Sequence, residues 1–164
     1  MTDNPLHDLV EAVFPPHPLD PADAFRDWGG TYLDAQDFKA GVRDRAWPSL
    51  DGAFLEFHHD ALYALGPAFL AEYLPACLAA LLRNDEALDA LPGFVVGVLT
   101  RRAPDRDPES RFEARIGALT DPQKRTIAEV FRHLEWISVD PVRKKSFEEA
   151  LDSYWRDYLD PVAR

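Results

Sequence analysis

Apolar residues recur along much of the chain at intervals of three and four positions, the spacing that places side chains on one face of a helix. This pattern predicts helices over residues 5–14, 34–43 and 67–82. Residues 54–65 fit either an extended or a helical segment, and we favour a helical or irregular turn. Another helix is expected to begin at Asn84 and to run towards Thr100, with an interruption at Pro92-Gly93.

Two more helices have start signals of the capping-box type, in which a Ser or Thr and a Glu or Gln three residues later each accept a backbone N–H at the helix start. The first signal is Thr120-Asp-Pro-Gln123, and apolar residues follow it at helical spacing. The second is Ser146-Phe-Glu-Glu149, followed by a helical pattern that reaches Leu159. We therefore expect one helix to begin at Thr120 and another to begin at Ser146.

The composition agrees with a helical fold. The chain has 22 Ala and 20 Leu against 10 Val, 3 Ile and 5 Thr, so residues that favour helices far outnumber those that favour strands. Apolar residues make up 46% of the 164 positions, enough for one sizeable core. Because the 14 Pro residues should interrupt helices, we expect an all-α, compact single domain over residues 1–164 with about six to eight short, Pro-interrupted helices.

The negative charge is concentrated in one part of the chain. The formal net charge is −11, and residues 1–60 carry 12 acidic and 4 basic residues. Residues 101–164 carry 13 of each, so all the excess negative charge lies in the first hundred positions. A strongly acidic chain is a poor partner for a nucleic-acid backbone or an anionic membrane, and we expect neither.

The single cysteine excludes an internal disulfide and a cysteine-based metal cage. Cys77 lies in an apolar run, where burial raises the pKa of a thiol and makes it inert. The first residues lack the basic and apolar regions of a signal peptide, and no apolar stretch approaches 18 residues. These observations favour a cytoplasmic protein.

Strong catalytic signatures are absent from the sequence. We find no glycine-rich dinucleotide or phosphate-binding loop, no His-Glu-x-x-His and no Gly-x-Ser-x-Gly. The charge-mixed segment from Arg101 to Glu109 is expected to be an exposed, salt-bridged loop rather than an acidic site. We therefore favour a protein without enzymatic activity over an enzyme, and we expect no cofactor.

One cluster has the residue types of a metal site, namely Glu56, His58, His59 and Asp60. Imidazoles and carboxylates bind divalent ions, but adjacent side chains diverge on a helix or a strand. At most two of the four would then point into one site. The competing interpretation is that the two histidines lie at the start of the next helix and bond backbone groups, and we prefer it.

Aspartates and aromatic residues alternate between positions 20 and 47. Aromatic side chains supply buried area at a protein interface, and carboxylates around them speed association with a basic partner. The candidate binding residues are Asp20, Asp23, Asp27, Trp28, Asp34 and Asp37, with Phe25, Tyr32 and Trp47 as further aromatic residues. The alternative is ordinary solubilising charge over a loop that covers the core.

Several runs of the chain resemble a known family. They include Asp60-Ala-Leu, Leu65-Gly-Pro-Ala-Phe69, Tyr73-Leu-Pro-Ala76, Trp47, Leu119-Thr-Asp-Pro-Gln123 and Ala150-Leu-x-x-Tyr154-Trp155. In these runs the sequence is similar to an uncharacterised bacterial family, a domain of unknown function whose members share a proline-bearing Tyr-Leu-Pro-Ala helix. The resemblance implies no established activity, and its residues are of the type found in cores and helix caps.

The leading functional hypothesis is a non-enzymatic, acidic protein-binding module. Such a module, of an immunity-like or regulatory kind, would occlude a basic protein partner that it attracts electrostatically. A first alternative is a small metal-dependent enzyme centred on Glu56, His58, His59 and Asp60. A second is a homo-oligomeric structural protein that uses a C-terminal helix bearing Tyr154, Trp155 and Tyr158.

Overall fold

A computed structural model of the protein describes residues 4–16, 18, 33–64, 66–83, 87–107 and 111–159. Its helices are α1 (Pro5–Val13), α3 (Leu33–Val42), α4 (Gly52–Phe57), α5 (His59–Leu62), α6 (Pro67–Leu82), α7 (Ala90–Leu99), α8 (Arg111–Gly117), α9 (Asp121–Ile137) and α10 (Pro141–Ser153). Two 3-10 turns, η1 (Trp47–Ser49) and η2 (Trp155–Tyr158), complete the described elements. These ranges contain no strand, which confirms the predicted all-α class, and seven of the helices have at least seven residues.

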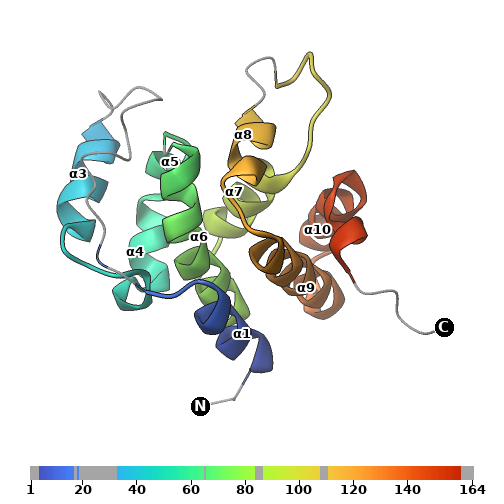
Figure 1. Cartoon of the computed structure of the whole chain (residues 1–164), viewed down its shortest axis with the longest axis horizontal. Coiled ribbons are helices and arrows are strands. Elements are labelled where there is room, and N and C mark those ends of the chain that lie inside the picture. The colour runs from blue at the N-terminus through green and yellow to red at the C-terminus, as the bar shows by residue number, and fades with distance from the viewer. Residues whose placement is uncertain are drawn as a thin grey trace.

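Helix α6 lies at the centre of the fold. Figure 1 shows α3, α4 and α5 on one side of α6 and α9 and α10 on the other, with α1 across the bottom, where it packs against α6 and α9. All side chains of α6 from Tyr73 to Leu82 are buried, as expected of a helix that is apolar on every face. One continuous core joins residues as distant as Val10 and Trp155.

Two of the local start signals are reproduced, those of α1 and α9. The side chain of Asn4 accepts the backbone N–H of Leu6 and caps α1. At α9 both halves of the predicted capping box form, because Thr120 Oγ1 accepts the N–H of Gln123 and the Gln123 side chain accepts the N–H of Thr120. Residues 54–64 adopt the expected irregular helical form, since α4 and α5 are two short helices that meet at His58.

The start predicted for the last long helix was wrong. Helix α10 begins at Pro141, where the Asp140 carboxylate accepts the N–H of Val142. Ser146 lies inside the helix, and its hydroxyl donates to the carbonyl of Val142 at 3.0 Å. Asp140 caps the helix and Pro141 takes its first position, six residues before Ser146. Because the helix has already begun there, the later Ser-x-x-Glu pattern lies in its interior.

Two substitutions test this corrected start. Asp140→Ala is expected to lower the free energy of unfolding by about 1 kcal/mol, because the N–H of Val142 loses its partner. Ser146→Ala should change it by no more than about 0.5 kcal/mol, since Ala is the better helix former at an interior position. Urea unfolding of both variants measures the difference. A larger loss for Ser146→Ala than for Asp140→Ala would contradict the start at Pro141.

Two further boundaries differ from the prediction. Helix α7 begins at Ala90 and continues through Pro92-Gly93, because Pro in a first turn removes an N–H that needs no helical partner. The proposed start at Asn84 lies outside the described residues. At the other end of the chain, α10 stops at Ser153, since Tyr154 has φ −163° and ψ −42°. The predicted continuous helix to Leu159 is therefore replaced by the η2 turn.

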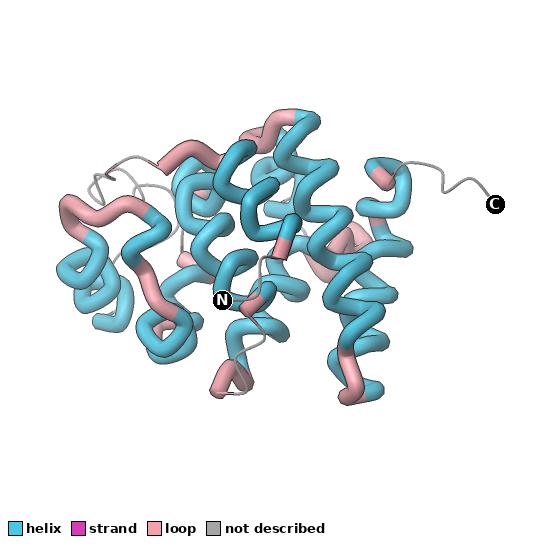
Figure 2. Tube along the Cα trace, turned by 90° about the horizontal axis from the view of Figure 1, so that it is seen from below, coloured by secondary structure: helices cyan, strands magenta, loops and turns pink. Residues whose placement is uncertain are grey.

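No helix within the described ranges has both the length and the apolar character needed to cross a bilayer. Figure 2 shows the same helices from below, with only short connections between most neighbouring elements. Within the described ranges, most of the residues that the sequence marks as candidates for function lie on α3, η1, α4 and α5.

Candidate protein-binding surface

The carboxylate of Glu56 caps a helix that is remote in sequence. Its two oxygens accept the backbone N–H groups of Ala90, at 2.6 Å, and Leu91, at 2.9 Å. Asp89, the residue before α7, makes no side-chain cap of its own. Partial burial opposes the charged form of Glu56, but the N–H groups that it accepts at the start of α7 hold the pKa of this carboxyl below its usual value. The charge also complements the positive end of the helix dipole.

The neighbouring histidines are engaged locally. His59 Nδ1 donates to the carbonyl of Glu56 at 2.7 Å, and His59 Nε2 lies 3.4 Å from an Asp60 carboxylate oxygen. The ring of His58 packs against those of Phe54 and Phe57, with centroids 4.6 Å and 4.9 Å away. Within the part of the chain that the structure describes, no three His, Cys, Asp or Glu side chains are grouped to hold a metal ion.

Phe57, at the end of α4, is the large apolar side chain that stands out in this region. It is 81% exposed, whereas Leu55 of the same helix is fully buried. Three carboxylates of the surrounding elements, those of Asp37, Asp51 and Asp60, are also exposed. The rings of Phe38 and Phe54, with centroids 5.7 Å apart, hold α3 against α4 beneath this surface. We call Phe57 with these three aspartates the Phe57 surface.

Close packing keeps the Phe57 surface in place. A Cβ atom at Gly41 of α3 would lie 2.6 Å from the ring of Phe54, so only glycine allows the two helices to approach this closely. Phe38 is fully buried, and its ring also meets that of Tyr73 in α6 with centroids 5.4 Å apart. Helices α3 and α4 are thereby anchored to the centre of the fold.

Most of the predicted acidic binding residues fall outside the described structure. Asp20, Asp23, Asp27 and Trp28 lie in the part of the chain that the structure does not describe. Asp34 belongs to α3, but its side chain is likewise outside the description, and Asp37 is exposed on the same helix. Of the further aromatic candidates, Trp47 is buried, and its Nε1 donates to the carbonyl of Phe14 at 2.8 Å. Trp47 is a core residue rather than an interface anchor.

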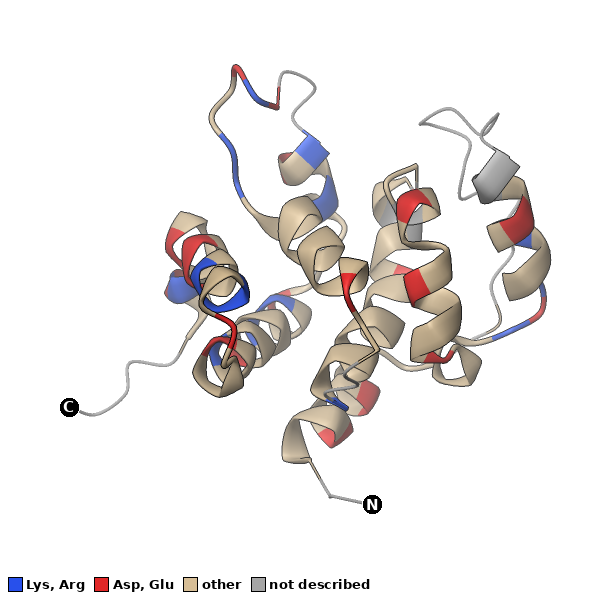
Figure 3. Ribbon diagram, turned by 180° about the vertical axis from the view of Figure 1, so that it is seen from behind, with Lys and Arg blue, Asp and Glu red and all other residues tan. Residues whose placement is uncertain are grey.

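The charges in the described residues follow the division seen in the sequence. Figure 3 shows mainly red acidic residues on α1, α3, α4 and α5, whereas blue basic and red acidic residues are mixed on α8, α9, α10 and the loop before α8. The Phe57 surface therefore lies in the acidic part of the molecule. Sequence reasoning missed Phe57 because α4 has only six residues, too few for periodicity to identify its buried face.

The other candidates from the sequence are packed into the fold. Burial raises the pKa of Cys77 to about 12, so its thiol is protonated and inert at neutral pH. Trp155 is fully buried, and Tyr154 and Tyr158 are half-buried with their hydroxyls 2.8 Å apart. These aromatic residues follow the end of α10 and lie at or in η2, not on the C-terminal helix that the oligomer alternative invokes.

Comparison with known proteins identifies a family for this chain. The sequence model of a family of unknown function, DUF6714, matches residues 16–159, which is most of the chain. The chain belongs to this family. Membership of DUF6714 confirms the predicted resemblance to a family of unknown function, while its bacterial origin and the Tyr-Leu-Pro-Ala helix as its shared feature stay predictions. No curated protein and no solved structure matches the chain.

Proposed function

We propose that the protein is a non-enzymatic binding module, of an immunity-like or regulatory kind, that occludes a basic protein partner. The observation that carries the proposal is the 81% exposure of Phe57, whose neighbouring elements also expose Asp37, Asp51 and Asp60. Burying a Phe side chain contributes roughly 1.5–3 kcal/mol, so a partner that covers Phe57 gains free energy that the isolated protein forgoes. Aromatic residues are also the usual anchors at the centre of protein interfaces.

The charge distribution supports a basic partner. Residues 1–60 carry 12 acidic and 4 basic residues, and Asp37, Asp51 and Asp60 lie on the elements that surround Phe57. Such a field attracts a basic surface over a distance of about 10 Å at ordinary salt and raises the rate of encounter. Steric occlusion of the partner would then be the module's activity, with no chemical step.

A photo-crosslinking experiment tests the proposal. Phe57 is replaced by p-benzoylphenylalanine in the full chain, which is then irradiated in cells of its native host. We expect one main covalent product with a basic protein, identified by mass spectrometry. Reconstituted with that protein, Asp37→Asn combined with Asp60→Asn should slow association by about tenfold, because the steering charge is lost. Raising the salt from about 0.1 M to 1 M should have the same effect.

The matched control places the crosslinker at Val142, which is 73% exposed on α10 outside the acidic part of the molecule. This position should not capture the same partner. Equal capture at both positions, capture of an acidic partner through Phe57, or association that ignores salt would contradict the proposal. A crosslinked dimer of the chain through Phe57 would favour the homo-oligomer alternative instead.

A further inference from the structure

A cleft of about 790 Å³ lies away from the Phe57 surface, between α7, the loop that follows it and α10. Its lining includes Gly93, Gly97, Arg101, Arg102, Arg106 and Glu149. The cleft thus gathers three arginines in a protein whose net charge is −11. Figure 3 shows the basic residues of this loop in blue. A volume of this size is in the range of small-molecule sites.

Two of these arginines keep their charge available. Arg102 and Arg106 are exposed, and neither forms an ion pair with another residue in the described ranges. Glu149, on the opposite wall, lies 3.6 Å from Lys145, which offsets part of its negative charge. Asp105 is the remaining carboxylate among the described lining residues, so the unpaired charge of the cleft is positive.

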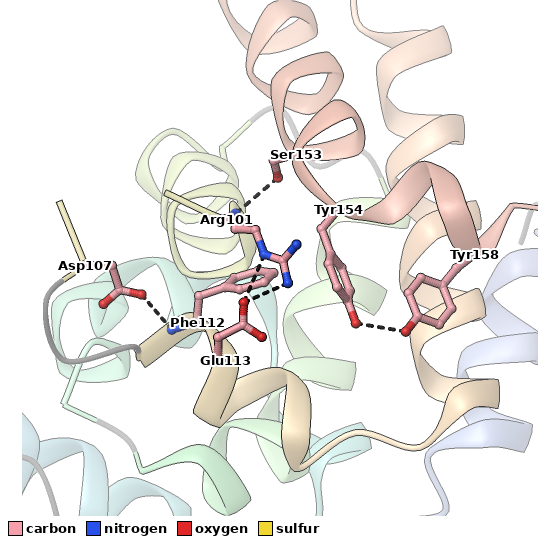
Figure 4. Close-up of polar contacts among 7 residues, drawn as sticks. All are labelled: Arg101, Asp107, Phe112, Glu113, Ser153, Tyr154 and Tyr158. Carbon is pink, nitrogen blue, oxygen red and sulfur yellow. Dashed lines mark hydrogen bonds and ion pairs between the residues drawn. The ribbon is translucent and has the colours of Figure 1, made fainter. Parts of the chain in front are cut away.

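Arg101 has a different role, which is to fix the loop. Its guanidinium pairs with Glu113 at 2.7 Å and lies over the rings of Phe112 and Tyr154, 5.6 Å and 5.0 Å from their centroids. Its backbone N–H donates to Ser153 Oγ at 3.1 Å. Figure 4 shows this side chain held between α8 and the end of α10. These contacts of Arg101 also fix the position of the backbone at the adjacent Arg102.

The α7 wall of the cleft is open at Gly93, where a Cβ atom would meet nothing within 4 Å. At Gly97 a Cβ atom would lie 3.2 Å from the Tyr63 hydroxyl and 3.7 Å from Arg102 Nη2. Arg102 thus reaches over the backbone of α7. The carbonyls at the end of α7 are already satisfied, since Val98 accepts from Arg115 Nη1 and Leu99 from Trp155 Nε1. These donors offset part of the negative charge at the end of α7, so the helix repels an anion less strongly there.

We infer that this cleft binds a small molecule through a phosphate monoester, held by Arg102 and Arg106. A guanidinium group donates a fork of N–H groups that matches phosphate oxygens. The nearly double negative charge of a phosphate monoester at neutral pH matches two cations better than a single carboxylate does. The rest of the volume, over Gly93 and Gly97, accommodates the organic part of the ligand. The site is independent of the proposed protein-binding function.

The test uses phenyl phosphate as the probe, with inorganic phosphate for the anion alone and phenyl sulfate as a singly charged analogue. In ¹H–¹⁵N NMR titrations of the full chain, saturable shifts are expected for amides between residues 93 and 106. Arg102→Ala and Arg106→Ala should each weaken the binding of phenyl phosphate by about tenfold or more, the usual loss for a charge-assisted hydrogen bond. Asp105→Asn should strengthen the binding of phenyl phosphate, because a carboxylate that repels the ligand is removed.

Two controls keep the test decisive. Arg125→Ala removes an exposed arginine of α9 that does not line the cleft, and it should leave binding unchanged. Gly93→Leu adds a side chain to the cleft without a clash at its Cβ atom. It should weaken the binding of phenyl phosphate more than that of inorganic phosphate, because it takes up the space for the phenyl group. Shifts spread over the whole surface, equal losses with Arg125→Ala, or no saturation at about 10 mM phenyl phosphate would overturn the inference. Equal affinity for phenyl sulfate would overturn the assignment to a phosphate monoester.

Discussion

Trp155→Ala is expected to destabilise the protein more than any other single truncation proposed here, by about 3–5 kcal/mol. The indole is fully buried, and its ring meets that of Phe131 with centroids 6.0 Å apart. Its Nε1 donates to the carbonyl of Leu99 at 2.7 Å, so the substitution leaves a cavity and removes the partner of a buried carbonyl. For a domain of this size the melting temperature should fall by about 10 °C or more, as measured by circular dichroism.

A matched tryptophan in the same chain provides the control. Trp136 of α9 is 81% exposed, and Trp136→Ala should change the free energy of unfolding by no more than about 0.5 kcal/mol. Trp155→Phe should give an intermediate loss, because most of the ring volume remains and only the N–H is missing. Similar losses for Trp136→Ala and Trp155→Ala would mean that Trp155 does not hold η2 against α7.

Glu56→Gln is the second substitution with a large expected effect, a loss of about 1–2 kcal/mol of stability at neutral pH. Glutamine has one acceptor oxygen where the carboxylate has two, so either Ala90 or Leu91 loses its N–H partner. The substitution also removes a negative charge at the start of α7, where the helix dipole favours one. Urea unfolding of the wild-type protein and the variant measures the loss.

The stability difference between the wild-type protein and Glu56→Gln is expected to depend on pH. Because the pKa of Glu56 is lower in the folded protein than its ordinary value of 4.5, the charged carboxylate stabilises the fold above that value. This contribution is lost as the pH falls through the folded pKa. The stability difference between wild type and Glu56→Gln should therefore be full at pH 7 and should shrink below about pH 4. A difference that stays constant down to pH 3 would contradict a charged cap.

Glu56→Gln also separates the structural role from the metal-dependent alternative. If Glu56 acts only as a helix cap, the variant is less stable and its metal content equals that of the wild type. Asp51→Asn is a matched control for a local cap, since Asp51 accepts the N–H of Phe54 within its own helix start. That variant should lose no more than about 1 kcal/mol. Stoichiometric metal that Glu56→Gln removes would favour the enzyme alternative.

Start signals that act within a few residues could be predicted from the sequence. Asn4 and the Thr120–Gln123 pair cap the helices that follow them, because the bonded atoms are only two or three residues apart. The error at Ser146 has a local cause as well, since two start signals lie six residues apart and the sequence pattern does not rank them. Only one can begin the helix, and the other then becomes an interior residue.

The candidate site depended on contacts that periodicity does not encode. Trp47 and Phe57 are both aromatic residues of short elements in the acidic part of the chain, yet one is buried and the other is 81% exposed. An element of three to six residues is shorter than two helical turns, so its apolar pattern does not distinguish the covered face from the free one. Packing against α1 and α6 decided that difference.

The sequence by itself determined the all-α class, the local caps of α1 and α9 and the concentration of negative charge in the first hundred residues, because each depends on composition or on neighbours along the chain. Tertiary structure alone decided that Glu56 caps α7 from 34 residues away and that Trp155 closes the core. It also placed Arg102 and Arg106 in one cleft. These contacts join distant segments, and only the packing of whole helices brings such segments together.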